Sequence, residues 1–371
     1  MKKIIVSGGG TGGHIYPAVA VAEALIRRYG SDVEILFVGA EGRMEMDKIP
    51  PLGYNIVGLP IAGLQRRLEW RNILLPYKVL KSISRAKEVI RDFGADIVVG
   101  FGGYASAPIL WTANRLGVPT VVQEQNSYAG LTNKIVARGA RKICVAYDGM
   151  ERFFNEDTIV MTGNPLRGNF SEVTSLRAQA LEYFGLNDEC PVVLVVGGSL
   201  GTRTLNNMMC RWVESAQGKL QDIQVIWQTG KIYEAEMQEF SKNHPIAGVW
   251  QGAFLERMDL AYAAADIVIS RSGACTVSEL SLVAKPTIFV PSPNVAEDHQ
   301  TKNAMALVEQ EAALMVPDSE AGNSAMALAV ATLKDRELLE DLRKNISKMA
   351  FPNAADVIVD EIDEILKESG K

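Results

Sequence analysis

The sequence predicts an α/β protein with two Rossmann-like, parallel-sheet domains that face each other across a cleft. Short apolar runs alternate with amphipathic helical patterns, and a unit of apolar run, glycine-rich turn and helix occurs near residue 4 and again from residue 191. A strand buried on both faces is apolar throughout, and strands that alternate with helices form a parallel sheet covered on both sides. The 371 residues are enough for two such domains.

In the first half of the chain, helical patterns separate the predicted strands. After a first strand at residues 4–6, apolar runs predict strands at residues 35–38, 55–59, 97–99, 120–122 and 143–146. Helical patterns lie around residues 77–93, 107–116 and 131–137. Because ligands of such sheets bind at the carboxyl ends of strands, we expect the polar loops at residues 102–104 and 123–126 to line a site.

The second half repeats the pattern after a boundary near residues 163–165 and a segment without strands to about residue 187. The apolar run at residues 191–196 leads into a glycine turn and a helical stretch from residue 204. Further strands are predicted at residues 225–227, 267–269 and 287–290, and a last helix at about residues 354–367.

Composition and cysteine use argue against several classes of protein. With 47% hydrophobic residues and a net charge of −6, the chain resembles an ordinary soluble protein and not a general nucleic-acid binder. The four cysteines form no C-x-x-C pair, the three histidines lie far apart, and no D-x-D pair follows a strand, so we expect no metal and a reducing cytoplasm. The first apolar run is too short for a signal peptide, and no window approaches the roughly 20 apolar residues of a membrane span.

The first glycine turn, at residues 7–17 (SGGGTGGHIYP), joins the first strand to the first helix. Glycines let a ligand approach the backbone, and the start of a helix favours anions, so a phosphate or diphosphate is expected here. The G-x-G-x-x-G spacing also fits a dinucleotide site with Glu41 as its ribose acid. A dinucleotide turn needs no titrating group at its end, however, and His14 stands there. A neutral imidazole beside an anion site is a candidate general base, although a single histidine is more often structural.

The turn at residues 270–279 (SRSGACTVSE) repeats this arrangement after a strand of the second half. Arg271 is suited to stabilise charge on a leaving diphosphate, and Glu279 to accept hydrogen bonds from vicinal ribose hydroxyls. The alternatives are a surface ion pair for Arg271 and a solvated helical carboxylate for Glu279. The loop at residues 298–303 (DHQTKN) offers amides that suit a sugar, or is a polar loop capped by Asp298.

A hydrolase is a rival interpretation of the second half. Residues 197–201 (GGSLG) fit the G-x-S-x-G nucleophile elbow, and Asp266 and His299 follow in the order that a catalytic triad requires. This interpretation explains neither His14 nor the turn at residues 270–279. We therefore favour Ser199 as a hydroxyl donor to a phosphate.

One basic segment departs from the acidic composition of the chain. Residues 66–91 contain eight basic and two acidic residues. A helix with Leu75, Val79, Ile83, Ala86 and Ile90 on its core face explains part of this pattern. The remaining apolar residues beside the positive charge suggest either a solvated helix or an interfacial membrane contact.

Together these motifs resemble glycosyltransferase family 28, and the resemblance covers nearly the whole chain. The motifs that carry it lie at residues 8–17, 101–104, 124–126, 129–134, 163–167, 197–199, 271–279, 300 and 303–304. The resemblance implies a GT-B fold with an N-terminal acceptor and membrane-facing domain (1–166), a C-terminal donor domain (167–351), and a last helix (352–371) that packs back on the first domain.

The resemblance also implies an activity in peptidoglycan synthesis. An inverting hexosyltransferase of this family moves N-acetylglucosamine from UDP-N-acetylglucosamine to the C4 hydroxyl of N-acetylmuramic acid in an undecaprenyl-diphosphate-linked acceptor, converting lipid I to lipid II. It would need no metal or other cofactor and would act as a peripheral protein on anionic lipid at the cytoplasmic face of the inner membrane.

Matching the family motifs residue by residue assigns expected roles. His14 is the expected catalytic base. The expected donor contacts are Thr11, Gly12, Gly13, Asn126, Arg167, Ser199, Leu255, Arg271, Ala274, Cys275, Thr276, Val277, Ser278, Glu279, Gln300 and Asn303. The expected acceptor-diphosphate contacts are Gly9, Gly10, Gly12, Gly13, Gly103 and Tyr104. The expected membrane contacts are Trp70, Ile73, Leu74, Tyr77, Lys78 and Lys81.

Two positions depart from the family pattern. Gln123 stands where many members carry histidine, so an acid or base role of that histidine either is not general in the family or is lost here, although glutamine can still form hydrogen bonds. His299 stands where glutamine is common, which leaves its sugar contact open but not that of Gln300. The alternatives are a GT-B transferase with another nucleotide sugar or acceptor, a non-catalytic nucleotide-sugar binding protein, and a dinucleotide-dependent oxidoreductase.

Overall fold

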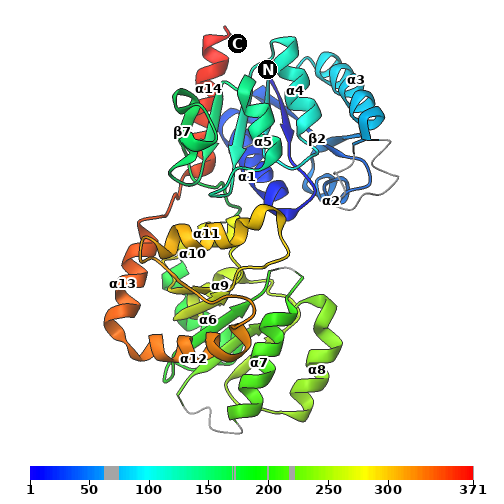
Figure 1. Ribbon diagram of the computed structural model, residues 1–371. Helices are drawn as coiled ribbons and strands as arrows, with labels where there is room; N and C mark the ends of the chain where they lie inside the picture. The colour runs from blue at the N-terminus through cyan, green and yellow to red at the C-terminus, as the bar shows by residue number, and fades with distance from the viewer. Residues whose placement is uncertain (62–74, 169, 171–172, 199, 217–221, 371) are drawn as a thin grey trace. The chain divides into compact units, whose positions relative to one another are not determined.

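The structure, a computed structural model, describes residues 1–61, 75–168, 170, 173–198, 200–216 and 222–370. The chain divides into two compact units (Figure 1). Unit 1 comprises Met1–Arg167 and Phe351–Lys371, and unit 2 comprises Gly168–Ala350.

Within the described residues, unit 1 contains a sheet of seven parallel strands in the order β3-β2-β1-β4-β5-β6-β7. The strands are β1 (Lys2–Ser7), β2 (Val33–Ala40), β3 (Asn55–Leu59), β4 (Ile97–Gly100), β5 (Thr120–Glu124), β6 (Lys142–Val145) and β7 (Ile159–Met161). Ile4 of β1 lies opposite Ile35 of β2 and Ile97 of β4. The strand order therefore reverses direction at β1, which places a topological switch point after Ser7.

Helices cover both faces of this sheet. They are α1 (Gly12–Tyr29), α2 (Met44–Lys48), α3 (Leu75–Phe93), α4 (Ala107–Leu116), α5 (Leu131–Val136) and α14 (Ala354–Glu368). Ile4 and Val6 belong to the core cluster that includes residues of α1 and α14, whereas Ile5 belongs to the cluster with α3 and α4. Alternate residues of β1 thus enter two cores, which explains why the strand is apolar throughout.

The last helix, α14, drawn in red in Figure 1, belongs to unit 1 although it ends the chain. Ile358 and Ile362 are fully buried in the cluster that α1 also lines. At the surface the Tyr29 hydroxyl of α1 donates a 2.6 Å hydrogen bond to Asp363. Apolar burial, with polar contacts at its edge, holds α14 against α1.

Unit 2 has the same plan, with six parallel strands among its described residues in the order β10-β9-β8-β11-β12-β13. The strands are β8 (Val192–Val196), β9 (Gln224–Gln228), β10 (Val249–Gly252), β11 (Ile267–Ser270), β12 (Thr287–Phe289) and β13 (Leu314–Met315). The helices are α6 (Arg177–Phe184), α7 (Arg203–Ala216), α8 (Glu234–Asn243), α9 (Met258–Ala264), α10 (Ala274–Leu282), α11 (His299–Val308), α12 (Ala321–Lys334) and α13 (Arg336–Ser347). Its switch point follows β8, which lies between β9 and β11.

The predicted fold class is confirmed, since both sheets are parallel and flanked by helices. The predictions at residues 55–59 and 107–116 coincide with β3 and α4. The strands β7, β10 and β13 were not predicted. Each lies at the edge of its sheet, is only partly buried and is at most four residues long, so its pattern is too short to mark a strand in the sequence.

Candidate active site

In unit 1, the loop after β4 lies against the glycine-rich turn after β1. A Cβ atom on Gly103 would collide with the Gly9 carbonyl oxygen and lie 3.1 Å from His14 Nδ1. One on Gly102 would lie 3.3 Å from His14 Cδ2. Gly102 and Gly103 also have positive φ, 85° and 77° respectively, which other residues rarely adopt. The two glycines therefore let the β4 loop enclose the imidazole of His14.

His14 lies in the first turn of α1, and its hydrogen bonds define its tautomer. Nδ1 lies 3.0 Å from the Gly9 carbonyl oxygen and 3.2 Å from Thr11 Oγ1. A carbonyl oxygen can only accept a hydrogen bond, so Nδ1 carries the proton and donates a hydrogen bond to the Gly9 carbonyl. In this tautomer the lone pair is on Nε2, which is the form that a general base requires.

The N-terminus of α1 presents the predicted diphosphate contacts. Thr11 and Gly13 are exposed, and Gly12 and Gly10 are partly exposed. The His14 N–H donates to the Thr11 carbonyl at 3.1 Å, whereas the helix offers no acceptor to the N–H groups that precede it. Those groups lie at the positive end of the helix dipole. Tyr104 lies beside this turn, because a Cβ atom on Gly10 would approach its ring to 3.6 Å. Burial raises the pKa of the Tyr104 hydroxyl, which keeps it protonated as a donor.

A buried carboxylate that the sequence analysis missed forms a hydrogen bond to the backbone of the glycine-rich turn. Glu45 of α2 is 1% exposed and accepts hydrogen bonds from the Gly10 N–H, at 3.0 Å, and the Ala40 N–H, at 2.9 Å. Cβ atoms on Gly9 or Gly39 would collide with it. Glycines at these two positions make room for the carboxylate. The sequence gives no direct signal of this contact, since a single acid in a polar turn is usually solvated.

The loop after β5 is organised by another buried acid, Glu124. Its carboxylate accepts hydrogen bonds from the Asn126 N–H at 3.0 Å, the Gly130 N–H at 3.0 Å and Asn133 Nδ2 at 2.8 Å. Burial raises the pKa of Glu124 in spite of these hydrogen bonds. The predicted donor contact Asn126 is thereby held, partly exposed, at the carboxyl end of β5.

Gln123 is fully buried and forms structural hydrogen bonds. Its Nε2 donates to Asn164 Oδ1 at 2.9 Å, and its Oε1 accepts from Gln125. The amide therefore joins the β5 loop to the segment after β7.

In unit 2, Arg271 connects loops that follow β8, β11 and β12. Its guanidinium donates to the Val290 carbonyl at 2.8 Å, to the Pro291 carbonyl at 3.0 Å and to Thr202 Oγ1 at 2.8 Å. It also forms a 2.6 Å ion pair with Asp318 and is 13% exposed. Arg271 is therefore partly buried and holds three loops together through hydrogen bonds. The alternative, an arginine in a surface ion pair, is wrong. Its positive charge lies at the start of the turn that leads into α10.

Glu279 of α10 is held by a buried tyrosine from α9. The Tyr262 hydroxyl, which is fully buried, donates to Glu279 Oε2 at 2.8 Å. Burial raises the pKa of Glu279 to about 7. The alternative of a freely solvated carboxylate is therefore wrong.

The remaining predicted donor contacts of unit 2 lie around the same turn. Ala274, Cys275 and Thr276 form the first turn of α10, and burial raises the pKa of the Cys275 thiol to about 12. The Gln300 carbonyl accepts from Ser272 Oγ at 2.8 Å, and Asn303 Nδ2 donates to the Ser272 carbonyl at 3.3 Å. Val277 and Leu255 are buried, and Ser278 is partly exposed. The turn after β11 and the start of α11 thus form one hydrogen-bonded group.

Three other residues singled out in the sequence remain to be placed. Arg167 lies in unit 1, exposed, with a 3.5 Å ion pair to Glu23 of α1. Ser199 lies outside the described residues. His299 begins α11, and its Nδ1 lies 2.8 Å from the Ala296 carbonyl oxygen.

Gln228 at the end of β9 is a further residue that the sequence analysis missed. Its side chain accepts from the Gly197 N–H at 3.2 Å and donates to the Gly198 carbonyl at 2.9 Å. The buried amide therefore shapes the glycine turn after β8. No local sequence pattern identifies this role, because the contact spans two strands of the sheet.

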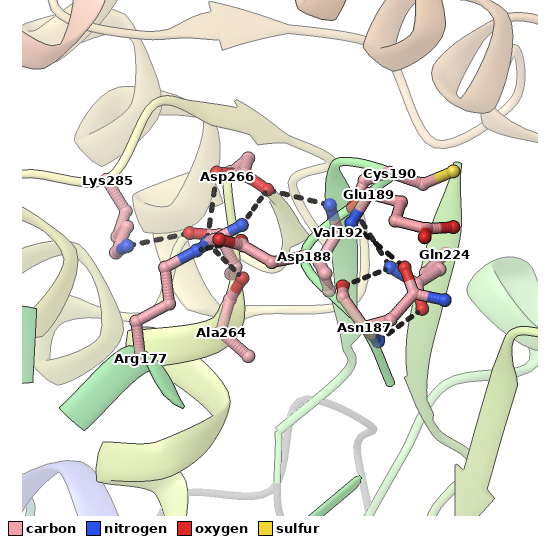
Figure 2. Close-up of polar contacts among 11 residues, drawn as sticks. Arg177, Asn187, Asp188, Glu189, Cys190, Val192, Gln224, Ala264, Asp266 and Lys285 are labelled. Carbon is pink, nitrogen blue, oxygen red and sulfur yellow. Dashed lines mark hydrogen bonds and ion pairs between the residues drawn. The ribbon is translucent and has the colours of Figure 1, made fainter. Parts of the chain in front are cut away.

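The structure excludes the hydrolase interpretation. Asp266 precedes β11 and binds Arg177 at 3.1 and 3.3 Å and the Val192 N–H at 2.8 Å (Figure 2). Val192 begins β8, whereas the turn at Gly197 follows its other end. Asp266 is therefore a full strand length away from the proposed nucleophile elbow and cannot orient a histidine there.

Two parallel-sheet α/β units, each with a glycine-rich turn after its central strand, are characteristic of the GT-B class of glycosyltransferases. The N-terminal domain model of glycosyltransferase family 28 matches residues 4–145, and its C-terminal domain model matches residues 192–358. The chain belongs to glycosyltransferase family 28.

Similar proteins span the full length of the chain. The UDP-N-acetylglucosamine--N-acetylmuramyl-(pentapeptide) pyrophosphoryl-undecaprenol N-acetylglucosamine transferase of Parabacteroides distasonis is 52% identical over 98% of both chains. The enzyme of the same name from Porphyromonas gingivalis is 51% identical over 98% of this chain and 96% of its own. The crystal structure of Acinetobacter baumannii MurG superimposes with a TM-score of 0.78 at 29% identity, covering 98% of this chain and 100% of that one.

Proposed function

We propose that this protein transfers N-acetylglucosamine from UDP-N-acetylglucosamine to the C4 hydroxyl of an undecaprenyl-diphosphate-linked muramoyl-peptide. The observation that carries the proposal is His14, held at the N-terminus of α1 in the tautomer with its lone pair on Nε2. The names of the full-length relatives at about 50% identity support the same donor and acceptor.

In the proposed mechanism His14 acts on the acceptor. Nε2 takes the proton of the C4 hydroxyl as that oxygen attacks the anomeric carbon of the donor. The bond from that carbon to the UDP oxygen breaks, and one displacement without a covalent intermediate inverts the anomeric centre. The open N-terminus of α1, together with Gly103 and Tyr104, would hold the acceptor diphosphate.

The donor is assigned to unit 2. Glu279 would accept hydrogen bonds from the ribose hydroxyls. The side-chain amides of Gln300 and Asn303 would bind the sugar. The first turn of α10 and the charge of Arg271 would stabilise the negative charge that develops on UDP. We propose that these groups make a divalent metal unnecessary.

Membrane attachment is proposed through the start of α3. Tyr77 and Leu80 are 66% and 68% exposed, and the adjacent Lys78 and Lys81 are exposed as well. Exposed apolar side chains among lysines suit an anionic bilayer surface. The further predicted contacts Trp70, Ile73 and Leu74 lie outside the described residues. Within the described ranges, no helix has the length and apolarity to cross a bilayer.

The assay of UDP release tests the proposed reaction. We expect release from UDP-N-acetylglucosamine only when the lipid-linked muramoyl-peptide is added, equally with and without EDTA. UDP-glucose or UDP-N-acetylgalactosamine as donor should give far slower release. Binding of UDP-N-acetylglucosamine without acceptor-dependent release would indicate a binding protein, and preference for another donor would indicate a different GT-B transferase. Loss of release in EDTA would overturn the metal-independent mechanism.

A further inference from the structure

One peptide group lies between Glu45 and His14. The carbonyl oxygen of Gly9 accepts the His14 Nδ1–H at 3.0 Å, and the N–H of Gly10 donates to Glu45 Oε2 at 3.0 Å. These two atoms belong to the same peptide bond, whose C=O and N–H are conjugated. Carboxylate, peptide group and imidazole therefore form one continuous hydrogen-bonded chain.

The position of Glu45 in this chain is fixed by its surroundings. The second carboxylate oxygen accepts from the Ala40 N–H at 2.9 Å, and the side chain is 1% exposed. Gly9 and Gly39 lack the Cβ atoms that would displace it. Burial of a carboxylate is costly, and a neutral side chain would avoid that cost. The carboxyl group of Glu45 thus lies directly behind the turn that carries His14.

We propose that Glu45 is a positioning residue that acts on His14 through the Gly9–Gly10 peptide group. This inference rests on the proposed role of His14 as base. A negative charge at the Gly10 N–H increases the electron density on the Gly9 oxygen, because hydrogen bonds in a chain polarise one another. The stronger acceptor holds the proton on Nδ1 and keeps the lone pair on Nε2.

The same chain acts during the reaction. When Nε2 takes the proton of the acceptor hydroxyl, the imidazole becomes positively charged while the Nδ1 proton stays in place. The polarised Gly9 carbonyl stabilises that charge. In serine hydrolases a carboxylate contacts the histidine directly; here a backbone peptide group lies between them.

Nitrogen NMR of the His14 ring tests this inference. The chain has three histidines, so ¹⁵N-histidine labelling gives few signals, which substitutions of His244 and His299 assign. In the wild type we expect the Nδ1–H form to predominate. In Glu45→Gln, which keeps the shape but removes the charge, we expect a shift towards the Nε2–H form. Ring shifts identical to those of the wild type would overturn the inference.

Kinetics provide a second measurement on the same variant. We expect kcat of Glu45→Gln to fall by about tenfold with the KM for UDP-N-acetylglucosamine within about twofold, since the proton transfer is affected and donor binding is not. The matched control is Tyr29→Phe, which removes the 2.6 Å hydrogen bond to Asp363 elsewhere in unit 1 and should leave kcat unchanged. No loss of kcat in Glu45→Gln, or an equal loss in both variants, would overturn the inference.

A reciprocal measurement remains decisive if Glu45→Gln does not fold. Combined ¹³C′ and ¹⁵N glycine labelling selects amides that follow another glycine, namely those of Gly9, Gly10, Gly13, Gly103 and Gly198. In His14→Ala we expect the Gly10 amide proton to move upfield, because the peptide group loses its polarising partner. A change at Gly10 no larger than that at Gly103, which lies against the same ring, would contradict the proposal. Turnover of His14→Ala is read separately, so failure of the base role and failure of the peptide connection are distinguishable.

Discussion

At the scale of single residues, Glu279 links ionisation to donor binding. Burial raises its pKa from the ordinary 4.5 to about 7, and the Tyr262 hydroxyl bonds one of its oxygens. A carboxylate that accepts ribose hydroxyls must be ionised to bind them best. Donor binding and folding therefore favour opposite protonation states of this group.

We predict opposite effects of Glu279→Gln on stability and on affinity. Because the folded-state pKa lies above the unfolded value, the donor-free wild type loses stability as pH rises from about 4.5 to about 7. The variant should therefore melt at a higher temperature than the wild type at about pH 8, and the difference should disappear near pH 4.5.

Calorimetry measures the affinity part of this prediction. Loss of the charged acceptor should weaken UDP-N-acetylglucosamine binding by about tenfold or more. Wild-type affinity should rise as pH increases through about 7, whereas that of the variant should not change. Tyr262→Phe, which keeps the carboxyl group, is the matched control and should retain the pH dependence. Equal affinities of wild type and Glu279→Gln would contradict the ribose assignment.

At the scale of elements, the start of α3 carries the proposed membrane contact. We predict that replacing Tyr77 and Leu80 by Asp abolishes sedimentation with anionic vesicles, because the apolar contact is lost and negative charge is added. Ile232→Asp is the control, since Ile232 of unit 2 is similarly exposed, at 70%, and should not contribute. The same double change at Trp70 and Leu74 is expected to have the same effect. Unchanged sedimentation of both double variants would exclude this surface.

Central strands were predictable from the sequence, whereas of the described edge strands only β3 was. Strands β1 and β8 are apolar throughout because helices cover both of their faces, and such runs are visible without a structure. Strand β10, at an edge, is partly exposed along its length and is not distinguished from a loop by its pattern.

The glycine-rich turns of the site were predictable from the sequence. The buried side chains that form hydrogen bonds to the site residues were not. The glycines and His14 are adjacent in sequence, so their proximity follows from the strand-to-helix turn. Glu45 lies 35 residues from Gly10, and Tyr262 lies 17 residues from Glu279. Such pairs are brought together only by the packing of separate elements, and a single sequence carries no signal of them.

At the scale of the whole molecule, the end of the chain completes unit 1. Five aliphatic side chains of α14 are 2% exposed or less, namely Ile358, Val359, Ile362, Ile365 and Leu366. Each fully buried aliphatic side chain contributes about 1.5–3 kcal/mol. Their sum is comparable with the roughly 5–15 kcal/mol that stabilises a typical domain.

We therefore predict that removal of residues 354–371 leaves unit 1 unfolded or aggregated, as measured by circular dichroism and sedimentation. Removal of residues 369–371 alone, which follow α14, is the control and should leave the melting temperature unchanged. A cooperative melting transition of normal temperature in the longer truncation would show that α14 does not support the unit 1 core.

The central claim is that His14 removes the proton of the acceptor hydroxyl, and the most direct test compares two properties of His14→Ala. We predict that UDP-N-acetylglucosamine binding by calorimetry is unchanged, while acceptor-dependent UDP release falls by about 10²–10⁴-fold, the usual contribution of a general base. Near-normal release by His14→Ala would contradict the claim and remove His14 from the catalytic role.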